Sequence, residues 1–206
     1  MLILAGSGCG AGKTAVGCAL IAAMPELRWI AVKFSPHAHE FSDTGLIWEE
    51  TDRDSDKDTG RYLAAGAARA FLAPGVDADA TQTMLNAVRL ARPGPHPGPR
   101  PGPRPGPHPG PHPGDALLVE SNQIEPALAA QPEEPLLCLA VLAGPERDWK
   151  PSIWPRIASA DALVLSGGLT PEQLSPQWRG KRTFCLPKEQ WITAELRMFV
   201  RECLRV

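Results

Sequence analysis

The most informative segment of this 206-residue chain is Ser7-Gly8-Cys9-Gly10-Ala11-Gly12-Lys13-Thr14. It follows an apolar, strand-like run at residues 1–5 and precedes an apolar segment of helix length at residues 13–24. It matches the pattern G-x-x-x-x-G-K-[ST] of phosphate-binding loops (P-loops), except that serine stands at the first glycine position. Glycines let successive backbone N–H groups curl around an anion, and the following helix adds the positive end of its dipole. The sequence therefore predicts a nucleotide-binding P-loop formed by all eight residues.

Four polar residues around this loop have expected roles in binding the nucleotide and Mg²⁺. Lys13 is expected to reach the β- and γ-phosphates and to act in catalysis, and the Thr14 hydroxyl is expected to ligate Mg²⁺. Glu120 ends the apolar run 115–120, as in a Walker-B strand, and is the second expected metal ligand; the alternative is a carboxylate that caps the strand end. Lys33, at the end of a strand expected over 28–34, is expected to meet a phosphate unless it lies at the surface.

Two polar segments supply weaker candidates. Residues 49–58 contain several carboxylates, of which Asp52 and Asp54 are the candidates for positioning a catalytic water, and Asp52 also for binding Mg²⁺. The alternative is a charged, solvated face. His37 and His39 are two positions apart, but a metal site needs a third ligand that the sequence does not identify, so a polar loop is the preferred interpretation.

The remaining pattern predicts an α/β domain. Apolar runs at 69–73, 115–120, 136–143 and 161–166 are expected strands, with an edge strand at 181–186. Helices are expected at 59–68, 77–92 and 152–160, and a C-terminal helix capped by Thr193 places its apolar residues at helical spacing. We therefore expect residues 1–206 to form a single P-loop NTPase domain, with a mostly parallel sheet covered by helices on both faces.

The chain contains 23 Pro and 19 Gly, but they are unevenly distributed. Residues 93–114 read PGPHPGPRPGPRPGPHPGPHPG, a low-complexity segment that can form neither helix nor sheet. We interpret it as a disordered insert without a function of its own. A polyproline ligand for a partner domain and a weak metal site at His96, His108 and His112 are the alternatives.

Composition excludes several classes of protein. The net charge of -2 argues against non-specific binding of nucleic acid, which requires a basic surface. No apolar run reaches the length of a membrane helix, and the N-terminal residues lack the basic start of a signal peptide. Five Cys without a C-x-x-C pair predict buried thiols in a reducing compartment, so a cytoplasmic location is expected.

In the order of its motifs the sequence resembles the molybdopterin-guanine dinucleotide biosynthesis protein B (MobB) family. After the P-loop, residues 31–39 (AVKFSPHAH) look like that family's strand followed by a lysine and a histidine-containing loop. Residues 57–67 (KDTGRYLAAGA) look like its Lys-Asp-Ser/Thr-x-Arg…Ala-Gly-Ala segment, and residues 117–120 (LLVE) like its strand ending in Val-Glu. The resemblance covers about the first 120 residues. The chain departs from it at Ser7 and at Ser121-Asn122, where the family has glycine after the glutamate.

The resemblance implies GTP binding with Mg²⁺, weak hydrolysis and dimerisation. It also implies a role in assembling or delivering the guanine-dinucleotide molybdenum cofactor, with a molybdenum cofactor nucleotidyltransferase or a molybdoenzyme as partner. No Asn-Lys-x-Asp motif selects guanine, so ATP stays open as the nucleotide. Two alternatives are an ATP-dependent ligase similar to dethiobiotin synthetase, or a small-molecule kinase, and a module that binds a nucleotide without catalysis.

Overall fold

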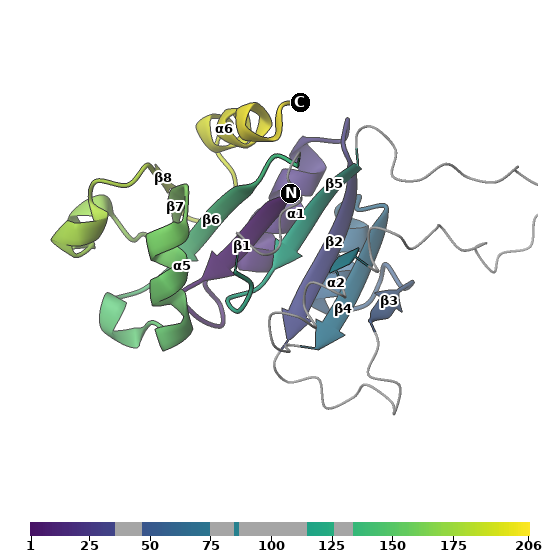
Figure 1. Ribbon diagram of the computed structural model, residues 1–206, viewed down its shortest axis with the longest axis horizontal. Helices are drawn as coiled ribbons and strands as arrows, with labels where there is room; N and C mark the ends of the chain where they lie inside the picture. The colour runs from purple at the N-terminus through teal and green to yellow at the C-terminus, as the bar shows by residue number, and fades with distance from the viewer. Residues whose placement is uncertain (36–46, 75–84, 87–114, 126–133) are drawn as a thin grey trace, which may run out of the picture.

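The computed structural model describes residues 1–35, 47–74, 85–86, 115–125 and 134–206. Within them the chain forms an eight-stranded sheet with the order β3-β4-β2-β5-β1-β6-β7-β8 (Figure 1). The strands are β1 (Leu2–Gly6), β2 (Arg28–Ser35), β3 (Trp48–Glu50), β4 (Arg69–Pro74), β5 (Asp115–Glu120), β6 (Leu137–Leu142), β7 (Ala162–Leu165) and β8 (Thr183–Cys185). All neighbouring pairs are parallel except β3 and β4. The expected α/β class and mostly parallel sheet are confirmed.

Helices cover both faces of the sheet. The α-helices of the described residues are α1 (Lys13–Ala23), α2 (Asp58–Ala64), α5 (Trp154–Ser159) and α6 (Ala194–Leu204), and four short 3-10 helices among these residues lie at Glu146–Asp148, Pro151–Ile153, Pro171–Gln173 and Pro176–Trp178. Because side chains alternate along a strand, Leu2 and Leu4 of β1 point to one face, where they share a core with α1, α2 and α6. Ala5 points to the other face and shares a core with Ile157 of α5.

Two elements of the C-terminal half match the expectations from the sequence. The Thr193 hydroxyl accepts a hydrogen bond of 3.2 Å from the Leu196 N–H, which is the expected N-cap of α6. β8 forms the expected edge strand, although it is shorter than the sequence suggested. No helix in the described part of the chain is long and apolar enough to cross a bilayer.

The structure differs from the sequence analysis in one strand and in two cysteines, and some predicted features lie outside the described residues. The short strand β3 was not predicted, because three residues are too few to show a period-two pattern. Of the cysteines, Cys138 is buried as expected, but Cys9 and Cys185 are exposed. The insert 93–114, the pair His37 and His39, and most of the helix expected at 77–92 lie outside the described residues.

Because the strands are parallel, the ends of β1, β2, β5, β6 and β7 lie along one edge of the sheet. β5 pairs directly with β1, with Glu120 opposite Leu4, and also with β2, with Glu120 opposite Lys33. This register brings the last residues of three strands beside the start of α1, where ligands bind in open α/β sheets.

Candidate functional site

The glycine-rich loop (residues 6–12) joins β1 to α1 in a fixed conformation. Gly10 and Gly12 adopt positive φ angles of 77° and 93°, a left-handed backbone that favours glycine. Ser7 is absent from the residues with positive φ, so a side chain is tolerated at the position where the P-loop pattern has its first glycine. The departure from that pattern therefore costs the loop no strain.

Hydrogen bonds to the segments that follow three other strands, β5, β6 and β7, hold the loop in place. The Ser7 hydroxyl accepts a hydrogen bond from the Ala143 N–H at 3.0 Å, and the Ser166 hydroxyl donates to the Ala11 carbonyl at 2.8 Å. The Asn122 amide accepts from the Gly6 N–H and donates to the Gly6 carbonyl, both at 2.8 Å. Asn122, in the Ser121-Asn122 pair at which the chain departs from the resembled family, thus satisfies both backbone polar groups of Gly6.

The loop presents backbone N–H groups that have no acceptor among the described residues. These are the N–H groups of Gly8, Cys9, Gly10, Gly12, Lys13 and Thr14; the first bond of α1 is donated by Val16 to the Gly12 carbonyl at 2.8 Å. Unpaired N–H groups at the start of a helix, in a loop with left-handed glycines, form a ready site for an anion.

Glu120 is the centre of a buried hydrogen-bond network at the end of β5. The residue is only 3% exposed, and its carboxylate accepts bonds from the Thr14 hydroxyl at 2.9 Å, the Tyr62 hydroxyl at 2.6 Å and the Lys33 ammonium at 3.1 Å. Burial, and then the charge of Glu120, raise the pKa of Tyr62 well above its ordinary value, so its hydroxyl stays a donor. The network fixes a negative charge beside the start of α1.

Lys33 lies between two carboxylates, those of Glu120 and Asp58. Burial alone would lower the pKa of Lys33, but the charge of Glu120 and the bond to Asp58 outweigh burial and raise it. For Asp58, burial alone would raise the pKa; the hydrogen bond and charge of Lys33, aided by the Thr14 hydroxyl, hold it below the ordinary value. The Lys33 ammonium thus sits between the carboxylates of Asp58 and Glu120.

Lys13 folds back over the loop that precedes it. Its ammonium donates to the Gly8 carbonyl at 3.2 Å and lies 4.0 Å from the Glu120 carboxylate. A Cβ at Gly6 would lie 2.5 Å from the Lys13 Cγ atom, so this path requires glycine there. Burial lowers the pKa of Lys13 more than the nearby Glu120 raises it.

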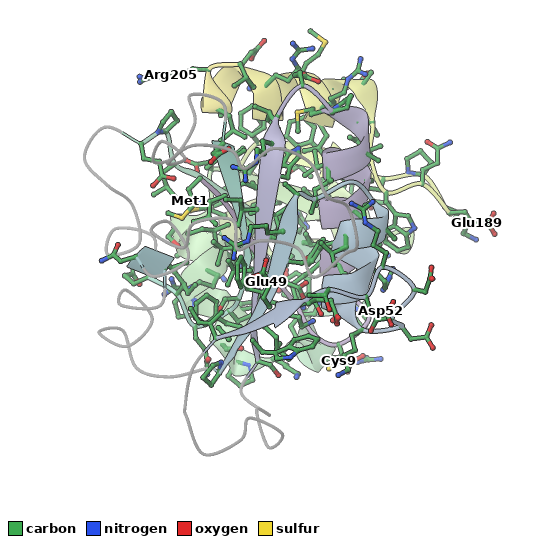
Figure 2. The ribbon with its side chains drawn as sticks, turned by 90° about the vertical axis from the view of Figure 1, so that its right-hand side faces the viewer. Met1, Cys9, Glu49, Asp52, Glu189 and Arg205 are labelled. Atoms are coloured by element: carbon green, nitrogen blue, oxygen red, sulfur yellow. The ribbon has the colours of Figure 1, made fainter. Side chains whose placement is uncertain are left out.

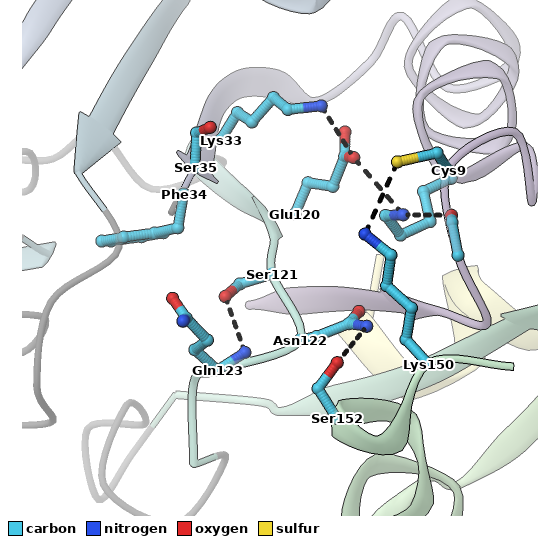
Figure 3. Close-up of a pocket in the computed structure, with 12 residues that line it drawn as sticks. Cys9, Lys33, Phe34, Ser35, Glu120, Ser121, Asn122, Gln123, Lys150 and Ser152 are labelled. Atoms are coloured by element: carbon cyan, nitrogen blue, oxygen red, sulfur yellow. Dashed lines mark hydrogen bonds and ion pairs between the residues drawn. The ribbon is translucent and has the colours of Figure 1, made fainter. Parts of the chain in front are cut away.

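These groups open onto a cavity of about 290 Å³ (Figure 3). Its walls come from the glycine-rich loop and α1, from the ends of β2 and β5, and from the segment after β6: Gly8, Cys9, Lys13, Lys33, Phe34, Ser35, Glu120, Ser121, Asn122, Gln123, Lys150 and Ser152. The Lys150 ammonium lies 3.6 Å from the Cys9 sulfur. Three lysines therefore face one cavity in which Glu120 is the one carboxylate of the described lining.

The predicted residues divide into two groups. Thr14, Lys33 and Glu120 lie in contact, Lys13 lies beside them, and residues 7–12 form the adjoining loop. Asp52 and Asp54 instead lie on an exposed turn between β3 and α2, where the Asp52 carboxylate accepts from the Asp54 N–H at 2.9 Å. Figure 2 shows Asp52 at the surface. Neither is among the described residues that line the cavity.

Sequence reasoning missed Asp58 and Tyr62 as site residues. Both belong to the 57–67 segment that carries the resemblance, and they reach the site because α2 packs against α1. Gly17 of α1 allows this approach, because a Cβ there would lie 2.8 Å from a Tyr62 ring carbon. A buried tyrosine within a helix gives no signal in the sequence that it touches a carboxylate at the end of a strand.

The described donors fit a magnesium ion bound together with phosphate. Among the described residues no three His, Cys, Asp or Glu side chains gather into a metal site. The Thr14 hydroxyl and the carboxylates of Glu120 and Asp58 are oxygen donors of the kind Mg²⁺ prefers, and Mg²⁺ commonly uses few protein ligands when phosphates supply the others.

Comparisons with known proteins identify no relative: no family model, no curated protein and no solved structure matches the chain. The function of the site therefore has to be inferred from its own geometry.

Proposed function

We propose that residues 6–14 are a P-loop and that the chain binds a nucleoside triphosphate, GTP or ATP, together with Mg²⁺. The observation that carries this proposal is the bond from the Thr14 hydroxyl to the buried Glu120 carboxylate, directly beside a loop with unpaired N–H groups. A hydroxyl at the start of the helix and an acid on the neighbouring strand are the two groups that hold Mg²⁺ in P-loop NTPases.

Each group of the site has a defined part in this proposal. The loop N–H groups bind the phosphates, and Lys13 leaves the Gly8 carbonyl for the more strongly charged β- and γ-phosphate oxygens. Thr14, Glu120 and Asp58 would hold Mg²⁺, which neutralises phosphate charge when bound. Lys33 then contacts the terminal phosphate with the ammonium group that now bridges Asp58 and Glu120.

We propose that hydrolysis is slow. A free carboxylate beside the terminal phosphate would speed hydrolysis by accepting a proton from the attacking water. Among the described lining residues the one carboxylate, Glu120, already accepts from three donors, and Asp52 and Asp54 point elsewhere in the structure. A slow enzyme of this kind suits the accessory role in molybdenum cofactor biosynthesis that the resemblance to the MobB family suggests, including dimerisation and binding of a nucleotidyltransferase or a molybdoenzyme.

A second candidate function is transfer of a phosphoryl group to a small molecule, as in a kinase or a ligase similar to dethiobiotin synthetase. The cavity favours it, because it continues past the glycine-rich loop to Phe34, Gln123, Ser152 and Lys150. These residues are not needed to hold a triphosphate, and the Lys150 ammonium has only the Cys9 sulfur as a described partner.

The experiment that tests the proposal is calorimetric titration of the chain with GTP and with ATP, each with and without Mg²⁺, followed by measurement of phosphate release. We expect binding that Mg²⁺ strengthens, with turnover well below that of typical enzymes. Tighter binding of GTP favours the MobB-like role, and turnover that rises with a small acceptor favours the kinase or ligase. Binding without any turnover identifies a nucleotide-binding module.

A further inference from the structure

The side chain of Trp191 lies against the glycine-rich loop and is 38% exposed. It belongs to the connection between β8 and α6, and a Cβ at Gly12 would lie 2.3 Å from the Trp191 Cζ3 atom. Gly12 thus makes room for an indole ring at the exit of the loop. Trp191 is one of the few large apolar side chains that the described residues leave exposed, and of the two tryptophans among them it is the one that lies against the loop.

The backbone around Trp191 is held at both ends, so its exposure is not a consequence of a loose segment. The Leu186 N–H donates to the Leu165 carbonyl at 2.8 Å, the Gln190 N–H closes a turn onto the Pro187 carbonyl at 3.2 Å, and Thr193 caps α6. Within this connection Glu189 points away from the body of the protein (Figure 2). The ring is therefore presented beside the loop by a fixed scaffold.

The connection after β7 reaches the glycine-rich loop at the preceding residue. Ser166 bonds to the Ala11 carbonyl, and the exposed Gly167 and Gly168 follow with positive φ angles of 64° and 81°. A Cβ at Gly168 would meet no atom within 4 Å. Two connections thus flank residues 11–12, one with an indole ring and the other with bare backbone next to open space.

The order of the strands fixes the direction in which a bound nucleotide would run. Lys33 and Glu120 lie on β2 and β5, on one side of β1, whereas Ser166 and Trp191 follow β7 and β8, on the other side. If the terminal phosphate lies at the charged groups, the nucleoside extends across the start of α1 toward the second side. Aromatic side chains stack on any nucleobase, because every base has a π-face.

We infer that Trp191 stacks on the base of the bound nucleotide. This inference rests on the proposed P-loop. It adds a contact to the base, which a nucleoside triphosphate has and inorganic triphosphate lacks. Stacking on a tryptophan does not depend on the base, so the contribution of Trp191 is expected to be the same for ATP and GTP.

The test measures the affinities of Mg·ATP, Mg·GTP and inorganic tripolyphosphate with Mg²⁺ for the unmodified chain and for Trp191→Ala, Trp191→Phe and Trp48→Ala. Trp48, which is 39% exposed on the edge strand β3, is the matched control. Loss of stacking in Trp191→Ala should weaken both nucleotides about tenfold and leave tripolyphosphate within about twofold. Trp191→Phe should restore most of the affinity, and Trp48→Ala should change none of the three.

Two results would overturn the inference while leaving the P-loop in place. The first is that tripolyphosphate binds to the unmodified chain as tightly as the nucleotides do. The second is that Trp191→Ala weakens the binding of all three ligands equally, or of none of them. Absence of binding by tripolyphosphate and both nucleotides would instead remove the proposed function itself. Circular dichroism and thermal unfolding of each variant show whether a change in affinity reflects a change in folding.

Discussion

The Thr14 hydroxyl donates a hydrogen bond of 2.9 Å to the Glu120 carboxylate, across 106 positions of sequence. The bond exists because β5, which ends in Glu120, pairs directly with β1, which leads into the glycine-rich loop and α1. It joins the two halves of the site: the loop with its unpaired N–H groups, and the buried Glu120 with the half-buried charges of Lys33 and Asp58.

Substitution Glu120→Gln should weaken the effect of Mg²⁺ on nucleotide binding. The amide keeps the size of the side chain but removes the charge that faces Thr14 and Lys33. We expect the gain in nucleotide affinity on adding Mg²⁺ to fall by about tenfold, in the range found when groups that support a metal site are removed. Calorimetric titrations with and without Mg²⁺ measure this gain. Glu202→Gln, on the exposed surface of α6, is the control, and an unchanged gain in Glu120→Gln would contradict the assignment.

Substitution Tyr62→Phe should destabilise the fold. The fully buried Tyr62 hydroxyl donates a bond of 2.6 Å to the Glu120 carboxylate, and its removal leaves that charge with one donor fewer. Hydrogen bonds to charged groups contribute about 1.5–3 kcal/mol, so we expect a loss of about 2 kcal/mol. Urea unfolding measures the free energy, and an unchanged m-value shows that the change lies in stability. A loss below about 0.5 kcal/mol would show that the bond is not needed.

Stability in acid should depend on Asp58. Its pKa in the folded chain lies below the ordinary value of 3.8, so its contribution is present above that pH and is lost as the pH falls through the folded pKa. The unfolding free energy of the unmodified chain should therefore exceed that of Asp58→Asn near neutral pH. This difference should shrink progressively below pH 3.8. A difference that stays constant throughout the acid range would contradict the pairing of Asp58 with Lys33.

The raised pKa of Lys33 makes the stability of the fold depend on pH in the alkaline range, whereas Asp58 does so in the acid range. Its contribution is present below the ordinary value of 10.5 and is lost as the pH rises through the folded pKa. The pair of Lys33 and Asp58 thus stabilises the fold across the neutral range and fails at both extremes.

The sequence was sufficient to predict most of the sheet and to name Thr14 and Glu120 as two ligands of one metal ion, and the structure places these two side chains in contact. Continuous apolar runs separated by helical segments indicate parallel strands, and an acid that ends such a strand meets the loop at the common edge. The choice of Asp52 and Asp54 could not be made in this way. Whether an acidic segment faces the site depends on its turn, and here β3 pairs antiparallel with β4 and leaves those carboxylates exposed.

Asp58 and Tyr62 were beyond sequence reasoning for a related reason. Their place in the site depends on how closely α2 approaches α1, which Gly17 permits by having no side chain. Contacts of this kind are set by packing between helices, and residue patterns within either helix do not reveal them.

The affinity of Lys13→Ala for Mg·GTP and Mg·ATP tests the central claim most directly. Lys13 starts α1, and its ammonium lies within the loop and near Glu120, where a triphosphate would bind. We expect the unmodified chain to bind nucleotide and Lys13→Ala to lose that binding. The control is Lys57→Ala, which should bind normally, because the Lys57 ammonium lies over the Trp48 ring. Retained affinity in a folded Lys13→Ala chain would contradict the assignment of residues 6–14 as a phosphate-binding loop.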